Sequence, residues 1–324
     1  MNNKVKVIKK LDISKIQPGT MEKFYYHISD NGLGLPVYIP VIVAKGRKPG
    51  KTLGFTAAVH GNELNGIKVI HKLMNEMHDD IEKLSGTIIA VPVVNTSGAL
   101  NTERFFNNGE DLNRIMPGKA KGNSSAQFAH RFIKTIISKM DYLVDLHTAS
   151  FGRVNSLYVR ADMENEQAAV IAKLQHPQII VHNKGRDGSL RSAATKMGIP
   201  SITLEVGDPQ RFQSKLIRES LIGIHNILSY LKMLPGEEQH SDIPAVICDK
   251  SYWIYTDRGG ILEIYPPLTA RVKKGDIIAR LFNIFGDPVQ TYSSPVDGVV
   301  VGKSVNPISQ TGARIIHIGI EAPV

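Results

Sequence analysis

The sequence contains a single cysteine, Cys248, among its 324 residues. One cysteine excludes a disulfide within the chain, and a metal cluster built from thiolates is not expected. Such sparing use of cysteine is typical of a reducing compartment, so we expect a cytoplasmic protein.

The chain also lacks long apolar runs and dense basic runs. No stretch of about 18 apolar residues is present, and the N-terminal segment has lysines but no apolar signal core. The net charge is +9, yet the densest basic stretch, KGRKPGK (45–51), is broken by glycine and proline. We therefore predict a solvated loop there and expect neither a membrane nor a nucleic acid as partner. The positive balance remains compatible with a small acidic substrate.

Most of the chain alternates between short apolar runs and longer amphipathic ones. This pattern indicates an α/β fold, with a mixed, largely parallel sheet that is covered by helices on both faces. Residues 1–35 show no clear pattern. The predicted strands are 37–43, 53–59, 86–94, 142–146, 156–159, 179–182 and 201–206. The predicted helices include 66–77, 126–139 and 217–234.

The pattern changes after a polar, proline-flanked segment at 234–244, which suits a linker. Short β-like runs separated by glycine and proline fill the rest of the chain. We predict two domains, an α/β domain at 1–240 and a small all-β domain at 245–324.

Two histidines and two glutamates stand at the ends of predicted strands. His60 and Glu63 follow the strand 53–59, and three residues of spacing on a helical turn can aim both at one point. His147 ends the strand 142–146, and Glu205 lies near the end of 201–206. The carboxyl ends of parallel strands meet at one edge of a sheet, so these side chains are expected to converge there.

Two imidazoles and one carboxylate are a favoured ligand set for catalytic zinc. We predict one Zn²⁺ per chain on His60, Glu63 and His147, with Glu205 off the metal and free to transfer protons. Asp145 shares the face of its strand with His147 and is a candidate partner for that ring. An HxxE pair alone is often a surface interaction, and Glu205 alone could be a structural carboxylate, so the prediction depends on the whole set.

Four motifs occur in order along the chain: HGNE (60–63), DLNR (111–114), DLHT (145–148) and LEVG (204–207). In this order they resemble the succinylglutamate desuccinylase/aspartoacylase family, a branch of the zinc-carboxypeptidase fold. The resemblance spans about residues 50–230. It implies hydrolysis of the amide between a small acyl group and the α-amino group of an amino acid. It also implies that His60, Glu63 and His147 bind zinc and that Glu205 is the general base.

The resemblance further implies a set of residues that hold the substrate. Arg114 would polarise the scissile carbonyl and Asn113 would help to position the substrate. Arg104 resembles an upstream arginine that touches substrate, and Arg191 resembles one that grips the substrate carboxylate. A guanidinium suits that task because it can bind a carboxylate through two hydrogen bonds. Arg153 and Arg160 flank a predicted strand, and a solvated position is favoured for both.

The C-terminal runs VKKGD (272–276) and SPVDG (294–298) resemble the barrel-sandwich fold of biotinyl and lipoyl carrier domains. Those carriers present a modified lysine on a hairpin tip, whereas the corresponding turn here, 283–288, contains no lysine. We therefore expect the fold without a swinging arm. Two roles stay open for this region, a cap on the catalytic cleft or an oligomer interface.

An N-acyl amino acid deacylase is the favoured function. A zinc carboxypeptidase acting on peptides is the alternative, with the same metal and base in a roomier cleft. A non-catalytic anion-binding protein that kept the fold is a third hypothesis, disfavoured because ligands, base and arginines occur together. Cobalt or manganese can also occupy such a site in vitro, and a homo-oligomer stays open.

Overall fold

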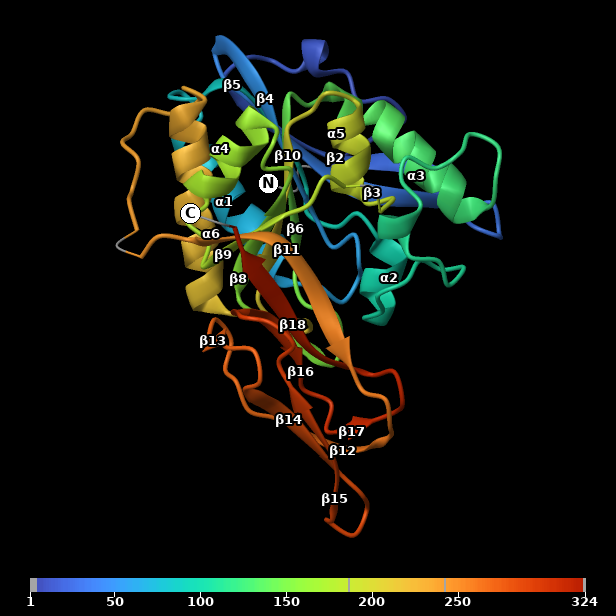
Figure 1. Ribbon diagram of the computed structural model, residues 1–324. Helices are drawn as coiled ribbons and strands as arrows, with labels where there is room; N and C mark the ends of the chain where they lie inside the picture. Colours follow the sequence, from blue (N-terminus) through green and yellow to red (C-terminus); the bar gives the residue numbers. More distant parts are fainter. Residues whose placement is uncertain (1–4, 186, 242, 323–324) are drawn as a thin grey trace.

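The computed structural model describes residues 5–185, 187–241 and 243–322. A 14-stranded mixed sheet runs through it (Figure 1). In spatial order its strands are β1 (Lys6–Ile8), β2 (Thr20–Asp30), β3 (Pro36–Lys45), β5 (Ser85–Val91), β4 (Lys48–Ala57), β6 (Tyr142–His147), β10 (Ser201–Val206), β8 (Leu157–Ala161), β9 (Ile179–His182), β11 (Val246–Tyr255), β18 (Arg314–Glu321), β16 (Gly298–Ser304) and β13 (Arg271–Val272), with β7 (Arg153–Asn155) paired to β16.

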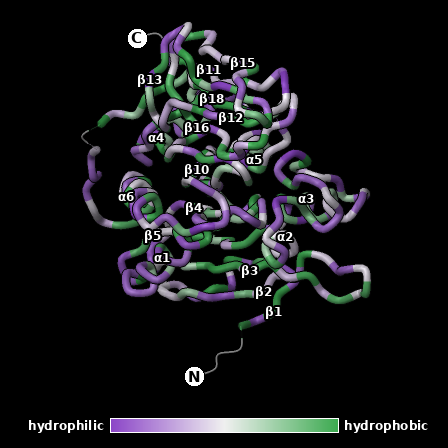
Figure 2. Tube along the Cα trace, turned by 90° about the horizontal axis from the view of Figure 1, so that it is seen from below, coloured by the Kyte–Doolittle hydropathy of each residue, from purple (hydrophilic) through white to green (hydrophobic). Residues whose placement is uncertain are grey.

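Helices cover both faces of this sheet, as the sequence predicted. The helices are α1 (Asn65–Asp80), α2 (Thr96–Asn101), α3 (Ser124–Thr135), α4 (Glu166–Leu174), α5 (Leu190–Lys196) and α6 (Ser214–Tyr230), with 3₁₀ turns η1 (Ile13–Lys15), η2 (Leu112–Arg114) and η3 (Ile137–Lys139). One apolar cluster joins the sheet to α1, α4 and α6, and a second joins its other face to α3 and α5. Figure 2 shows mixed polar and apolar colouring along α1 and α3, as expected for helices with one buried face.

The strands β5, β4, β6 and β10 are neighbours and run parallel, so their carboxyl ends meet at one edge. Antiparallel strands lie outside this group, including β3 beside β5 and β8 beside β10. The prediction of a mixed, largely parallel sheet is confirmed. This edge is where the predicted metal ligands and Glu205 emerge.

Some boundaries differ from the predictions. The segment at 1–35 contributes the 11-residue strand β2, which pairs in parallel with β1 and antiparallel with β3. The strand predicted at 86–94 ends at Val91, before Pro92, which has no N–H to donate to a ladder. The helix predicted at 126–139 is divided into α3 and η3.

In the described residues of the C-terminal region, all regular secondary structure is β-strand. A separate antiparallel sheet is formed by β15 (Pro288–Ser293), β14 (Ile277–Phe282), β12 (Gly260–Ile264) and β17 (Ile308–Ser309). A distinct apolar cluster packs within this region, and Figure 1 shows it projecting from the α/β part. The turn from Asn283 to Asp287 joins β14 to β15 and is closed by the Asn283 side chain. The predicted β architecture is confirmed, whereas the division at 240–245 stays a prediction, since β11 continues the main sheet beside β9.

Among the described residues, every helix is too short or too polar to cross a membrane.

Candidate metal centre and cavity

The turn after β4 positions His60 and Glu63. Close approach of two chain segments shapes it, because a Cβ on Gly61 would lie 2.0 Å from the carbonyl carbon of Gly98. Ala58 has φ 49°, a left-handed conformation that L-residues rarely adopt. His60 and Glu63 are thereby turned inward, with exposed fractions of 3% and 2%.

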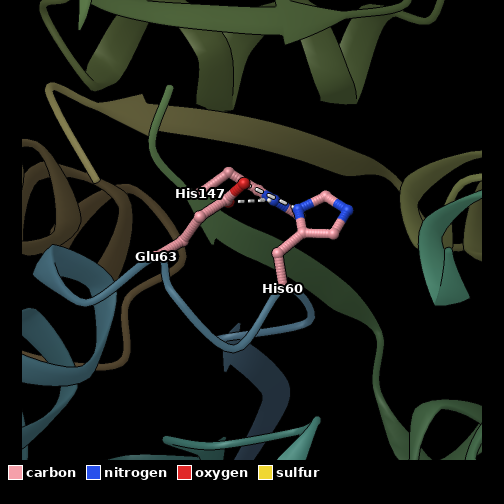
Figure 3. Close-up of side chains that lie close together, drawn as sticks. All are labelled: His60, Glu63 and His147. Carbon is pink, nitrogen blue, oxygen red and sulfur yellow. Dashed lines mark hydrogen bonds and ion pairs between the residues drawn. The ribbon is translucent and has the colours of Figure 1, made fainter. Parts of the chain in front are cut away.

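His147, the last residue of β6, completes a buried His–Glu–His group (Figure 3). Glu63 Oε1 lies 2.7 Å from His60 Nδ1, and Glu63 Oε2 lies 2.8 Å from His147 Nδ1. One potential ligand atom from each residue lies within 4.8 Å of the others. The structure therefore brings together the three side chains that the sequence predicted as metal ligands.

The Nε2 atom of each imidazole, on the side of the ring away from Glu63, contacts a carboxylate. His147 Nε2 lies 2.9 Å from Asp145 Oδ2, and His60 Nε2 lies 2.9 Å from Asp111 Oδ1. Because an ionised carboxylate only accepts, we assign a donated proton to each Nε2. The Nδ1 atom of each ring faces Glu63 and is then available as a metal ligand, and His60 Nδ1 has no hydrogen-bond partner among the described residues. Histidine ligands of metals are commonly oriented in this way.

Opposite charges stabilise one another within the buried group. Burial opposes the charged form of Glu63, but the two histidines outweigh it and lower the pKa of that carboxyl. Burial also opposes a charge on His147, yet Asp145 and Glu63 outweigh it and raise the pKa of that ring. Two nitrogen lone pairs and a carboxylate fit a divalent ion in the zinc class.

Glu205 stands beside this group. It is the Cα partner of His147 across the parallel strands β10 and β6. Asn155 Nδ2 donates to Glu205 Oε2 at 3.2 Å, and Arg160 Nε lies 3.8 Å from Glu205 Oε1. Burial raises the pKa of Glu205, which favours proton exchange over a permanently ionised role.

A cavity of about 370 Å³ opens over the His–Glu–His group. Every site residue predicted from the sequence lines it, and six arginines face four carboxylates there. The arginines are Arg104, Arg114, Arg153, Arg160, Arg191 and Arg314, and the carboxylates are Glu63, Asp111, Asp187 and Glu205. Since Glu63 and Asp111 are already engaged with the histidines, the wall carries excess positive charge that suits an anionic ligand.

Arg191 is the most buried of these arginines, with an exposed fraction of 1%. Its guanidinium donates to the carbonyl oxygen of Asn183 at 2.9 Å and to Asn183 Oδ1 at 2.6 Å. No carboxylate of the described residues lies within ion-pair distance of it. Burial lowers the pKa of Arg191, the cost of holding a cation away from water. A ligand carboxylate would offset that cost.

Asn113 and Arg114 lie on η2, facing α5. Asn113 Oδ1 accepts from the backbone N–H of Leu190 at 2.7 Å, which ties η2 to the segment that carries Arg191. Arg114 lies 3.8 Å from Asp187 and keeps 59% of its side chain exposed. Its guanidinium is therefore free to engage a ligand.

Arg104 is more constrained than the sequence indicated. Its Nη2 lies 2.9 Å from Asp111 Oδ2, its Nη1 lies 3.2 Å from Glu63 Oε1, and Nη1 also donates to Ser150 Oγ. These contacts hold Glu63 and Asp111 in place. A direct contact of Arg104 with substrate stays a prediction.

The solvated positions favoured for Arg153 and Arg160 were wrong, since both arginines line the cavity. Arg160 donates to Tyr158 Oη at 2.8 Å, because the two residues share one face of β8. Arg153 lies 5.7 Å from the Trp253 ring centroid. The alternation of side chains along a strand could have indicated that Arg160 and Tyr158 lie together. The contact between Arg153 and Trp253 depends on the tertiary fold.

The C-terminal region supplies one wall of the cavity through Trp253 and Arg314. The Arg314 guanidinium lies 5.3 Å from the Trp253 ring centroid, and His317 stacks on that indole at 5.1 Å. Burial, with Arg160 and Arg314, lowers the pKa of His317 well below its usual value, so this ring is neutral. Sequence reasoning missed Trp253 and Arg314. Their position supports the cap alternative for this region.

Fold and site together define an α/β chain with a buried His–Glu–His group that could hold a metal ion and a nearby glutamate at the carboxyl edge of its sheet. Residues 49–231, more than half of the chain, match the model of the succinylglutamate desuccinylase/aspartoacylase catalytic domain. The chain belongs to this family of amide-hydrolysing deacylases.

Individual relatives agree with this assignment. The chain is 26% identical over 283 residues to the N-alpha-acetyl-L-2,4-diaminobutyric acid deacetylase of Halomonas elongata, covering 82% of this chain and 81% of that protein. A succinylglutamate desuccinylase/aspartoacylase structure from Rhodobacter sphaeroides matches with a TM-score of 0.84 at 20% identity, covering 95% and 98% of the two chains. The product-bound ectoine utilization protein of Ruegeria pomeroyi matches with a TM-score of 0.80 at 22% identity, covering 93% and 94%. These two structural matches show a shared fold.

Proposed function

We propose that this protein is a zinc-dependent hydrolase that cleaves the amide bond of small N-acylated amino acids. The observation that carries the proposal is the opening of the His60–Glu63–His147 group and Glu205 into one arginine-rich cavity. Membership of the deacylase family and the deacetylase relative support the same reaction.

His60, Glu63 and His147 would hold the zinc. When bound, the ion would supply a water molecule of lowered pKa and a Lewis acid for the amide carbonyl. Glu205 would accept the proton of the attacking water and deliver it to the leaving amine. Its burial and raised pKa suit that double task, and Asn155 holds the carboxylate in position.

Arg114 and Arg191 would bind two different parts of the substrate, the scissile carbonyl and the α-carboxylate. Arg114, largely exposed to the cavity, would stabilise the negative charge that develops on the carbonyl oxygen. Arg191 would bind the α-carboxylate through its planar guanidinium, with Asn113 fixing the distance between the two segments. Arg104 would maintain the metal ligand Glu63 while facing the substrate.

The outer wall of the cavity, formed by Arg153, Trp253 and Arg314, favours acidic members of the substrate class. Arg153 and Arg314 flank Trp253 at the cavity wall, and no ion pair within the described residues engages either guanidinium. A second anionic group, on the acyl part or on the amino-acid side chain, would meet both. The size of the cavity suits such a small molecule better than a peptide.

A substrate panel tests the proposal. The zinc-loaded protein is incubated with N-acetyl and N-succinyl amino acids, including acetyl-aspartate and N-alpha-acetyl-2,4-diaminobutyrate, and with C-terminal dipeptides. Released amine is quantified with and without a chelator. We expect chelator-sensitive release from acyl amino acids, highest for acidic ones. Release from peptides alone would assign the protein to the carboxypeptidases instead.

A further inference from the structure

A second His–Glu–His group lies away from the cavity. It consists of His176, between α4 and β9, and of Glu238 and His240, in the segment between α6 and β11. One potential ligand atom from each residue lies within 4.8 Å of the others. In the described residues, only this group and the group at the cavity have that arrangement of histidine and carboxylate atoms.

Two distances in this group are close to those between zinc ligands. Glu238 Oε1 lies 3.4 Å from His176 Nε2 and 3.6 Å from His240 Nδ1. Ligand atoms at the corners of a tetrahedron with bonds near 2.0–2.1 Å lie about 3.3–3.4 Å apart. A zinc ion placed between the three side chains would therefore need only small side-chain rotations, and two of them are substantially exposed.

A buried ring nitrogen in this group has no hydrogen-bond partner among the described residues. His176 Nε2 is buried and has no hydrogen-bond partner, although Glu238 Oε1 is only 3.4 Å away. The same situation holds for His60 Nδ1 beside Glu63 in the cavity. In both groups a ring nitrogen faces a carboxylate oxygen without donating a hydrogen bond, as expected where a cation belongs between them.

The backbone around the group is fixed before any metal binds. Asn226, on α6, accepts from the N–H of Gln239 at 2.9 Å and donates to the carbonyl oxygen of Gln239 at 3.1 Å. Its Nδ2 also donates to the carbonyl oxygen of Leu174, at the end of α4. Gln239 stands between Glu238 and His240, so these bonds hold both candidate ligands against the segment that carries His176. The left-handed φ of 45° at His176 directs a third ligand to the same point at a conformational cost.

We propose that His176, Glu238 and His240 form a second divalent-metal site, which takes zinc and fastens the segment before β11 to the turn between α4 and β9. This segment leads into β11, the strand that carries Trp253 to the cavity wall. The role of the second metal is structural, and it is independent of the reaction proposed for the cavity.

Metal counting tests the site directly. Metal-free protein is titrated with Zn²⁺, and bound zinc is measured for the wild type and for His240→Ala, Glu238→Gln and His60→Ala. We expect two ions per chain in the wild type and one in each variant. The matched control is His225→Ala, since His225 pairs with Glu76 at 2.8 Å on the surface without a third ligand. That variant retains two ions.

One ion in the wild type that His60→Ala loses, or two ions in His240→Ala, would overturn the proposal. Misfolding cannot imitate the expected loss, because the His240 side chain is 79% exposed and circular dichroism is compared for all variants. If the wild type binds one ion that His240→Ala loses and His60→Ala keeps, or if His60→Ala keeps two ions, the cavity assignment fails while the second site stands, so the two proposals fail separately.

Limited proteolysis supplies a readout that does not involve activity. Cleavage within 235–241 requires this segment to detach, and zinc should slow it about 100-fold when free zinc is 100 times the dissociation constant. The experiment uses the His60→Ala variant, with His60→Ala/His240→Ala as control. Equal cleavage rates with and without zinc in His60→Ala would contradict the fastening role.

Discussion

Glu205 and His147 are direct neighbours across two parallel strands, paired at the carboxyl ends of β10 and β6. Backbone hydrogen bonds of the sheet therefore fix the separation between the proposed base and a proposed metal ligand. Thr56, on the adjacent strand β4, adds a bond of 2.7 Å to Asp145, which in turn holds His147. Rigid strands set this geometry more precisely than loops can.

Replacing Glu205 by glutamine should lower kcat by about 10²–10⁴-fold while zinc stays bound, because only the proton acceptor is removed. Turnover and metal content are measured on the same preparation. Glu82→Gln, which changes an exposed carboxylate paired with Arg47, is the control. Loss of zinc from Glu205→Gln would contradict the assignment of Glu205 as a base off the metal.

Asp111 is expected to act through His60. The Asp111→Asn variant should bind zinc about 10–100-fold more weakly, since a neutral amide oxygen accepts from the His60 ring more weakly than the carboxylate and its amide can turn an N–H towards the ring instead. His60→Ala should lose the cavity metal altogether. Competition with a chromophoric chelator measures both affinities. An unchanged affinity in Asp111→Asn would show that the 2.9 Å contact does not support the ligand.

The sequence predicted what depends on local pattern. Apolar strands that end on His60, His147 and Glu205 placed these residues at one sheet edge, and the period of a strand placed Asp145 behind His147. The pairing of Asp111 with His60 was not predicted, because a loop that no periodicity describes brings the two together. The resemblance marked the motif containing Asp111 without revealing that contact.

The outer wall of the cavity could not be predicted from the sequence either. Trp253 lies on β11 and Arg314 on β18, and they reach the cavity only because these strands extend the main sheet beside β9. Such pairing depends on contacts across large sequence separations. The solvated reading of Arg153 failed for the same reason, since its neighbour in space is Trp253.

Arg191→Lys should raise KM for an acyl amino acid by about 10–100-fold, corresponding to a lost charge-assisted hydrogen bond of about 1.5–3 kcal/mol. Lysine keeps the charge but cannot present two parallel donors to a carboxylate. Steady-state kinetics are compared with those of Arg218→Lys, an exposed change on α6. A KM equal to that of the wild type would remove Arg191 from the carboxylate site.

Cys248 should resist thiol reagents in the folded protein. Burial raises the pKa of its thiol to about 11 from the usual 9.0, so almost no thiolate forms at pH 8. The folded state therefore retains a proton that the unfolded state releases, and this contribution to stability falls as pH rises from about 9 to 11. Alkylation rates in native buffer and in denaturant test the first point, and unfolding of Cys248→Ser across this pH range tests the second. Rapid alkylation of folded protein at pH 8 would contradict the burial.

Arg314→Gln should distinguish substrates by charge. If Arg314 and Arg153 bind a second anionic group, kcat/KM for acetyl-aspartate should fall by up to about fivefold, because a partly exposed charge pair is worth up to about 1 kcal/mol. The value for acetyl-alanine, which has no second carboxylate, should hardly change. Trp253→Ala should weaken both substrates, since the indole packs against both guanidiniums and forms part of the wall. Arg258→Gln, on an exposed part of the C-terminal region, controls for a general loss of positive charge. Equal losses for the two substrates in Arg314→Gln would mean that the outer arginines attract anions without selecting among them.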